Sequence, residues 1–183
     1  REALILLSEE RLVDIFPQSR TVVAAIDVQR AREAHFLRRS VEVEIVRNLA
    51  PKISPRQIAE LRVSVAQQQL NAADGDLGAF SVNDDRFHQL TYEYMNVGGL
   101  WELVRSGSAH LDRLRRLDLP MGSKVEDILV AHTAIVDALE TGDPAAAEET
   151  VRAHLKGTVF AADAIRAHFP EYFEPVAEAV RAP

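Results

Sequence analysis

From residue 27 onward, apolar residues recur at spacings of three, four and seven, which is the pattern of one buried face of an α-helix. Residue types that start or stop helices divide this stretch into separate segments. The expected helices cover about 27–50, 55–74, 76–95, 100–117, 124–141 and 144–168, with a further helical segment over 171–181. Because the connections are short, the pattern predicts an all-α protein, an antiparallel helical bundle of six to seven helices.

The boundaries of these helices depend on residues that suit helix ends. Ser54–Gln57 has the pattern of a capping box with proline at the first helical position, and Ser123–Glu126 has the pattern of another capping box. In Thr141–Pro144, the glycine suits a left-handed helix end and the aspartate suits the cap of the next helix. The apolar positions expected to face the core from the helix over 55–74 are Ile58, Leu61, Val65 and Leu70.

Residues 1–26 follow a different pattern. Arg1–Leu7 is helical in character but has no capping residue before it, so we expect the printed sequence to begin inside a helix and more of the protein to precede it. Runs of β-favouring residues at 12–16 and 21–26 flank Pro17–Arg20, which predicts a small β-hairpin. Since an isolated hairpin is only marginally stable in water, this hairpin should belong to a larger module.

Composition narrows the class of protein. The chain is 47% hydrophobic and only 6% aromatic, which favours helices over a β-sandwich or barrel. Its net charge of −7 argues against wrapping nucleic acid around the whole chain, although a small basic module is compatible with it. The lack of cysteine excludes disulfides, cysteine-ligated zinc and thiol catalysis, and suits a reducing cytoplasm. No apolar run reaches the roughly 18–20 residues of a membrane span, so we expect a soluble cytoplasmic protein with no membrane partner.

Three of the histidines fall on helix faces that should be buried. His132 is followed by apolar residues three, four and seven positions later, and His154 follows Val151 by three positions. Asp84 and His88 are four residues apart, so their side chains are neighbours on one face of a helix. The helical period therefore turns one carboxylate and three imidazoles toward the interior of the bundle.

Such polar groups are costly to bury without partners, but they can satisfy one another around a divalent cation. Three imidazoles and one carboxylate suit zinc best, with nickel, iron and manganese as alternatives. Spacing alone leaves Asp85, three residues before His88, as an alternative to Asp84. The competing interpretation is that each histidine is an ordinary core residue. The remaining histidines, expected at the surface or at a pocket edge, are His35, His110 and His168.

The arginines give weaker signals. Arg38 and Glu42 are four residues apart and are expected to form a solvated ion pair of little energetic weight. The cluster of Arg113, Arg115 and Arg116 predicts a solvated face, from which one arginine turned inward could bind a carboxylate. The sequence has no His-Glu-x-x-His, no phosphate-binding glycine-rich loop and no paired Glu-x-x-His motif, which weakens a metalloprotease or an oxidase.

Several motifs along the chain form a recognisable set. The set comprises Arg1–Leu4 with Leu12–Val13 and Thr21–Ala24, Arg38–Glu42, Asp84–Leu90, Ala131–Ile135 with Ala138, Gly142–Asp143 and Ala147, and Arg152–Leu155. Together they resemble the GntR-family transcription regulators of the FadR-like group, whose ligand-binding part is the FCD domain. The resemblance implies that residues 1–26 are the tail of a winged helix-turn-helix DNA-binding domain, with the recognition-helix end and the wing. Residues 27–183 would then be the FCD-type effector-binding bundle.

The resemblance also assigns residues to roles. The family's metal ligands fall on four positions, which favours Asp84 over Asp85: Asp84, His88, His132 and His154. Ser19–Thr21 stands where the family usually has Arg-Gly-Thr at the wing tip, and Arg11 where it has glycine. Arg20 can still reach a DNA phosphate from that position.

The implied function is a ligand-responsive DNA-binding transcription regulator, and not an enzyme. We expect a repressor and a homodimer that binds operator DNA through its N-terminal domain. Four protein ligands leave an octahedral ion two open positions, which suit a small organic acid whose other oxygens pair with Arg38 or Arg113. The alternative is a metal-dependent hydrolase on a helical bundle, with Asp85 or Glu93 as the general base. A purely structural metal is the third interpretation.

Overall fold

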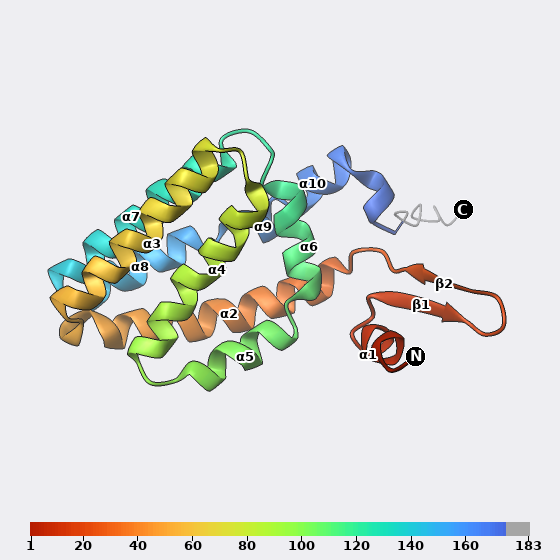
Figure 1. Ribbon diagram of the computed structural model, residues 1–183, viewed down its shortest axis with the longest axis horizontal. Helices are drawn as coiled ribbons and strands as arrows, with labels where there is room; N and C mark the ends of the chain where they lie inside the picture. Colours follow the sequence, from red (N-terminus) through yellow and green to blue (C-terminus); the bar gives the residue numbers. More distant parts are fainter. Residues whose placement is uncertain (175–183) are drawn as a thin grey trace, which may run out of the picture.

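The computed structural model describes residues 1–174, which form ten α-helices, two 3₁₀ turns and one two-stranded sheet (Figure 1). Five helices make up the body: α2 (Val28–Leu49), α3 (Pro55–Ala73), α4 (Leu77–Tyr94), α7 (Lys124–Thr141) and α8 (Pro144–His154). Between α4 and α7 lie α5 (Gly98–Ser106) and α6 (Ala109–Asp118), and after α8 come α9 (Gly157–Phe160) and α10 (Ala162–His168). The predicted all-α bundle is confirmed.

The body packs around an apolar core to which all five helices contribute. Helix α3 packs against α4 and α7, and α2 packs against α4 and α8. Leu61, Phe87 and Leu139 are almost completely buried in this core. Burying one large apolar side chain contributes about 1.5–3 kcal/mol, so contacts of this kind fix the relative positions of the helices that carry the polar site. None of the described helices is both long and apolar enough to cross a lipid bilayer.

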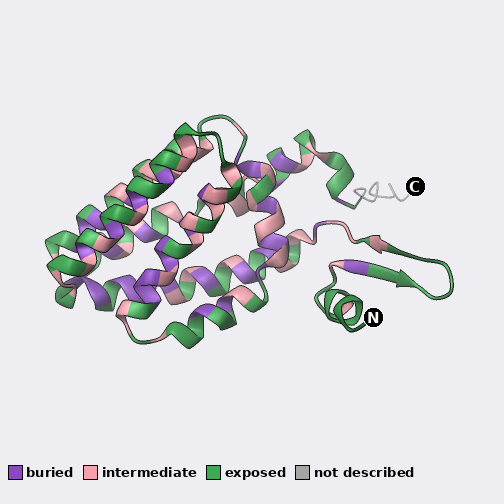
Figure 2. Ribbon diagram, viewed as in Figure 1, coloured by how far each residue is buried: buried purple, intermediate pink, exposed green. Residues whose placement is uncertain are grey.

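The N-terminal residues form a small unit at one end of the molecule. It consists of α1 (Glu2–Glu9), β1 (Val13–Phe16) and β2 (Arg20–Val23), and it projects away from the bundle (Figure 1). The strands are antiparallel, with Val13 opposite Val23 and Phe16 opposite Arg20. The expected hairpin is confirmed, although β2 ends at Val23 and does not continue to residue 26. Figure 2 shows that most of this unit is exposed.

A short linker, Ala24–Asp27, joins the hairpin to α2 and is anchored on α6. The Nη1 of Arg113 donates a hydrogen bond to the carbonyl of Ala24 at 2.9 Å. The backbone N–H of Asp27 donates to Nδ1 of His110 at 3.1 Å, and the Asp27 side chain caps α2. His110 is buried, whereas the sequence predicts a position at the surface or at a pocket edge.

The helix ends predicted at Ser54, Ser123, Gly142 and Asp143 are confirmed, but one of the two predicted capping boxes is not formed. Ser54 forms the expected capping box, Gly142 ends α7 in the left-handed conformation with φ of 74°, and Asp143 caps α8. The expected capping box at Ser123 is not formed. Its hydroxyl donates instead to Asp127 at 3.1 Å, so no side chain caps the start of α7.

Two expected helices are divided. The segment 100–117 breaks at Gly107 into α5 and α6, and the segment 144–168 breaks into α8, α9 and α10. Gly157 lies at the second break, where a Cβ atom would come within 2.8 Å of the ammonium nitrogen of Lys124. The two breaks let α6 and α9 turn across the end of the bundle, where they pack against each other and against α2.

Two further expectations differ from the structure. Leu70 is 59% exposed, because it lies five residues after Val65 and so falls off the buried face of α3. In the segment 171–181, Pro170–Tyr172 forms a 3₁₀ turn and not an α-helix. The part of that segment from residue 175 onward lies outside the described residues.

Candidate metal centre

Three histidines from three helices bring their Nε2 atoms together inside the bundle. His88 lies on α4, His132 on α7 and His154 at the end of α8. The Nε2 of His154 lies 3.1 Å from the Nε2 of His132 and 3.2 Å from the Nε2 of His88. The three residues can each offer a ligand atom within 4.8 Å of the others. All three rings thus face inward, as the helical period predicts.

The other nitrogen of two of these rings has a hydrogen-bond acceptor beside it. Nδ1 of His88 lies 2.8 Å from Oε2 of Glu42, and Nδ1 of His132 lies 2.7 Å from Oε1 of Gln68. A carboxylate oxygen and an amide oxygen both accept, so each Nδ1 carries the proton. In the neutral form of each ring, Nε2 is then unprotonated and presents a lone pair to His154.

Lone pairs that face one another need a donor or a cation between them. His154 can donate one Nε2–H, whereas a divalent cation satisfies all three nitrogens at once. Zn–N bonds of about 2.0–2.1 Å in a tetrahedral site set the ligand nitrogens about 3.3–3.4 Å apart. The observed separations of 3.1 and 3.2 Å are close to that spacing. The histidine set therefore fits an ion of the size of zinc.

Asp84 lies one helical turn before His88 and is buried at the edge of the histidine cluster. Its Oδ1 is 3.7 Å from Nε2 of His132, and its Oδ2 accepts a hydrogen bond from Arg115. Asp85 is more exposed and pairs with Arg115 at 3.0 Å on the outer side. The geometry thus places Asp84, and not Asp85, beside the histidines.

Burial and charge set the protonation of the cluster. Burial lowers the pKa of His132 to about 3, and it also holds the pKa of His154 well below its usual value. Burial alone would raise the pKa of Asp84, but the Arg115 guanidinium, together with His132, His88 and Arg38, outweighs burial and holds that pKa far below the usual range. Near neutral pH, His132 and His154 are neutral and Asp84 is ionised, which are the forms that bind a metal ion.

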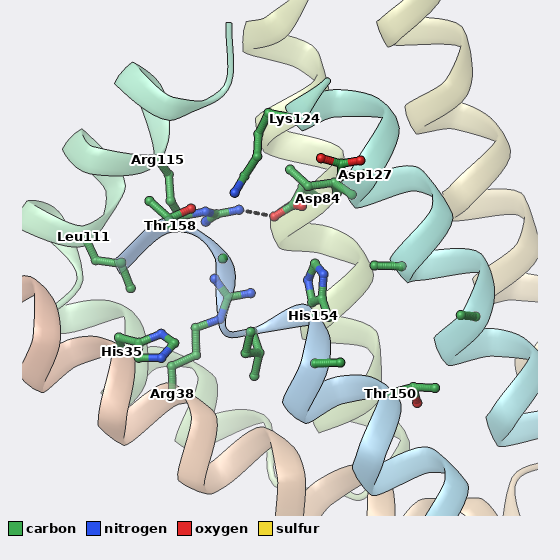
Figure 3. Close-up of a pocket in the computed structure, with 16 residues that line it drawn as sticks. His35, Arg38, Asp84, Leu111, Arg115, Lys124, Asp127, Thr150, His154 and Thr158 are labelled. Atoms are coloured by element: carbon green, nitrogen blue, oxygen red, sulfur yellow. Dashed lines mark hydrogen bonds and ion pairs between the residues drawn. The ribbon is translucent and has the colours of Figure 1, made fainter. Parts of the chain in front are cut away.

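A cavity of about 420 Å³ lies beside the histidine cluster (Figure 3). Asp84 and His154 reach it from the cluster, and Arg38, Arg115 and Lys124 also line it. The apolar part of the lining comes from Leu111, Ile128, Ala131, Ala134 and Leu155. The cavity therefore combines an apolar wall with several cationic groups next to the candidate metal ligands.

Arg38 is buried, contrary to the expected solvated ion pair. Its Nε donates to Oε1 of Glu42 at 2.6 Å, and both side chains are almost inaccessible to solvent. Among the described residues its Nη2 has no hydrogen-bond partner, and Figure 3 shows the guanidinium directed into the cavity. A buried donor without a partner is free to bind an acidic group of a ligand.

The other predicted arginines lie elsewhere. Arg113 is not part of the cavity lining, because its guanidinium is bonded to the linker at Ala24. The arginine of this cluster that turns inward is Arg115. Arg20 lies at the start of β2, with its guanidinium 5.2 Å from the centre of the Phe16 ring. His35 lines the cavity edge as expected.

The sequence also held signals for two residues whose part in the site was not predicted. Gln68 follows Leu61 by seven positions and Val65 by three, so it lies on the buried face of α3. Glu42 precedes Leu49 by seven positions on the buried face of α2. A polar residue on an apolar stripe needs a buried partner, and here each partner is a candidate metal ligand.

Comparison with known proteins agrees with this architecture. The FCD domain family matches residues 33–157. An HTH-type transcriptional regulator from an unstable DNA locus of Streptomyces ambofaciens is 36% identical over 173 residues, which are 94% of this chain and 72% of that protein. The HTH-type transcriptional repressor RspR of Escherichia coli K12 is 31% identical over 156 residues, which are 85% of this chain and 68% of that protein.

Solved structures share the fold. Escherichia coli McbR/YncC has a TM-score of 0.72 at 16% identity and covers 92% of this chain and 79% of its own. A GntR transcriptional regulator from Rhodococcus sp. RHA1 has a TM-score of 0.67 at 24% identity and covers 95% of this chain and 80% of its own. The fold and these relatives define a class, the HTH-type transcriptional regulators that carry a helical domain. Within that class, the chain belongs to the FCD-domain family.

Proposed function

We propose that this transcriptional regulator responds to a small organic acid through a divalent metal ion held by His88, His132 and His154, with Asp84 as the acidic ligand. The observation that carries the proposal is the meeting of three Nε2 atoms, two of which are held as acceptors by their outer partners. Zinc suits this donor set best, and nickel, iron and manganese are alternatives. With these four protein ligands, an ion in octahedral coordination would have two open positions for an oxygen ligand.

The cavity supports a carboxylate as the effector. It lies beside the candidate ligands, and Arg38 and Arg115 bring guanidinium groups to its wall. Guanidinium groups match the geometry of carboxylates and bind them in two-point contacts. The apolar wall would contact the hydrocarbon part of such an acid. Arg113 is no longer proposed as an effector ligand, because it binds the linker.

We propose that residues 1–26 belong to the DNA-binding domain and that the regulator acts as a homodimeric repressor. The named repressor among its relatives supports that direction of regulation. Arg20, on the exposed hairpin, is the proposed phosphate contact. An effector that binds one arrangement of the dimer more tightly changes operator affinity by the difference, commonly about 1–3 kcal/mol.

A metal-dependent hydrolase is less well supported. The two carboxylates proposed as general bases are both engaged in ion pairs, Asp85 with Arg115 and Glu93 with Arg86. The curated relatives are named as regulators. We therefore expect no hydrolysis of esters or amides, and turnover that vanishes with a chelator would contradict the proposal.

The first experiment measures metal content by elemental analysis of untagged protein, wild type beside His132→Ala and His154→Ala. We expect about one equivalent of metal in the wild type and a clear loss in both variants. Their melting temperatures should also fall, because an ion at a thousandfold excess over its Kd stabilises the native state by about 4 kcal/mol. His168→Ala, at an exposed ring on α10, is the matched control. Equal metal content in all four proteins would remove the site assignment.

A second experiment separates an effector site from a purely structural metal. Small mono- and dicarboxylic acids are titrated by calorimetry into metal-loaded protein and into protein stripped with a chelator. Binding that requires the metal supports the effector site. Loaded protein that binds none of the acids supports a structural ion and contradicts the proposed regulation.

A further inference from the structure

We propose that Gln68 is a positioning residue for the metal centre, because its buried amide holds His132 in the tautomer that leaves Nε2 free to bind the ion. This inference rests on the proposed metal site. It assigns to a residue of α3, which supplies no metal ligand, the task of preparing a ligand on α7.

The orientation of the Gln68 amide is fixed by its surroundings. The side chain is completely buried between α3, α4 and α7. Its Nε2 donates to the backbone carbonyl of Asn83 at 3.4 Å, so its oxygen faces His132 at 2.7 Å from Nδ1. The Asn83 side chain is itself held by a 2.7 Å hydrogen bond to Asn71. Because an amide oxygen only accepts, the proton between Gln68 and His132 resides on the imidazole.

The ring of His132 has little freedom apart from the position of its proton. Phe87 stacks on it, with ring centres 4.2 Å apart and an interplanar angle of 16°. Packing therefore fixes the plane of the ring, but packing cannot choose between protonation at Nδ1 and at Nε2. Without an acceptor at Nδ1, the proton would be better placed on Nε2, where His154 lies 3.1 Å away. That tautomer would block the lone pair that the metal needs.

The two outer partners of the centre differ in charge. His88 has the carboxylate of Glu42 at its Nδ1, and that carboxylate is also paired with Arg38. His132 has a neutral amide instead. Gln68 thus fixes which nitrogen of His132 carries the proton, and it adds no further negative charge to an interior that already holds Asp84 and Glu42. Buried carboxylates are costly unless each has its own cationic partner.

The test begins with the wild-type protein. Nitrogen-15 NMR of the imidazoles, recorded on chelator-treated protein near neutral pH, reports which nitrogen of His132 carries the proton. We expect the Nδ1–H form, and the Nε2–H form would overturn the proposal. This measurement does not depend on the folding of any variant.

The second measurement compares Gln68→Met with Gln67→Met and Gln69→Met, whose side chains are exposed on the same helix. Methionine keeps a similar length but is only a weak acceptor. We expect zinc affinity, measured by competition with a chromogenic chelator, to fall about 10- to 100-fold in Gln68→Met alone, as is typical for loss of an outer partner. The proton of His132 should also move to Nε2 in that variant. Affinity within twofold of the wild type would overturn the role of Gln68.

The outcomes separate this inference from the proposed function. If the wild type binds no zinc, the metal site itself is wrong. If the wild type binds zinc and Gln68→Met binds it equally well, the site stands and only the role of Gln68 is removed.

Discussion

The buried pair of Arg38 and Glu42 shows how a single spacing can describe two different interactions. Residues four apart on a helix are neighbours whether their face of the helix is exposed to solvent or buried. Here the face is buried, and Glu42 contacts both the Arg38 guanidinium and the ring of His88. Burial alone would raise the pKa of Glu42, but Arg38 and His88 outweigh it and lower that pKa to about 2. The pair therefore stays ionised in the interior.

Replacing Arg38 by methionine should destabilise the protein strongly. The change leaves the Glu42 carboxylate buried without its cationic partner, which typically costs about 3–5 kcal/mol. Urea denaturation gives the free energy of unfolding. Arg47→Met is the matched control, because the pair of Arg47 and Glu44 on the same helix is exposed and 4.0 Å apart. We expect the control to change stability by less than about 0.5 kcal/mol, and a similarly small loss for Arg38→Met would contradict the buried pair.

At the level of residues, the sequence predicted the inward-facing histidines better than their surroundings. The helical period correctly turned His88, His132 and His154 inward. It could not separate Asp84 from Asp85, since both are within one turn of His88, and the choice depends on how α4 rotates against α7. The roles of outer partners depend on contacts between helices, which no spacing within one helix contains.

Two different faces of helix α6 contact two different parts of the molecule, the linker and the cavity. His110 and Arg113 anchor the linker to the hairpin, whereas Leu111 and Arg115 line the cavity. The sequence did not predict which of these residues would face the linker and which the cavity, because it predicted one helix over 100–117. The break at Gly107 lets α6 take a direction of its own, and this direction decides that Arg115 and not Arg113 reaches the interior. Helix ends marked by strong caps, such as Ser54, were predicted well for the opposite reason: their signal is local.

The linker anchor should weaken in mild acid. Burial lowers the pKa of His110, and the nearby Arg113 lowers it further. The unfolded chain, with an ordinary histidine pKa of about 6.5, then binds protons that the folded chain does not. Stability from this group is present above about pH 6.5 and is lost as the pH falls below it. Protonation also removes the acceptor for the Asp27 N–H.

His110→Gln removes this titration. We expect the free energy of unfolding of the variant to decline less between neutral and mildly acidic pH than that of the wild type, by at most about 1.4 kcal/mol per pH unit. Denaturant titrations at a series of pH values give the comparison. His168→Gln, at an exposed position on α10, should follow the wild-type profile. Parallel profiles for His110→Gln and the wild type would refute the effect.

At the scale of the whole molecule, the described residues divide into a packed bundle and a projecting hairpin unit. The three clusters of buried apolar residues consist only of residues between Ile26 and Phe173. The hairpin unit meets the bundle mainly through the linker. In the sequence, β-favouring runs give way to residues that start and stop helices at Asp27, and this change of pattern is the local signal for where the bundle begins.

Removal of residues 1–23 should therefore leave the bundle folded. We expect a fragment 24–183 to keep its helical circular dichroism and its metal content, and to melt within about 4 °C of the parent chain, the shift that about 1 kcal/mol produces at this size. The parent chain in the same buffer is the control. A fragment that aggregates or loses its metal would show that the hairpin unit is part of the bundle's stability.

The histidine cluster also matters for the topology of the chain. An ion bound there would join positions 22 and 66 residues apart in the sequence, as the paired rings already do in space. In a chain without cysteine, such an ion would act as a cross-link between helices of the folded state and would be released when the chain unfolds. Unlike a disulfide, this cross-link would form and break with the supply of metal. The stability of the bundle would therefore depend on how much of the metal is available in the cell.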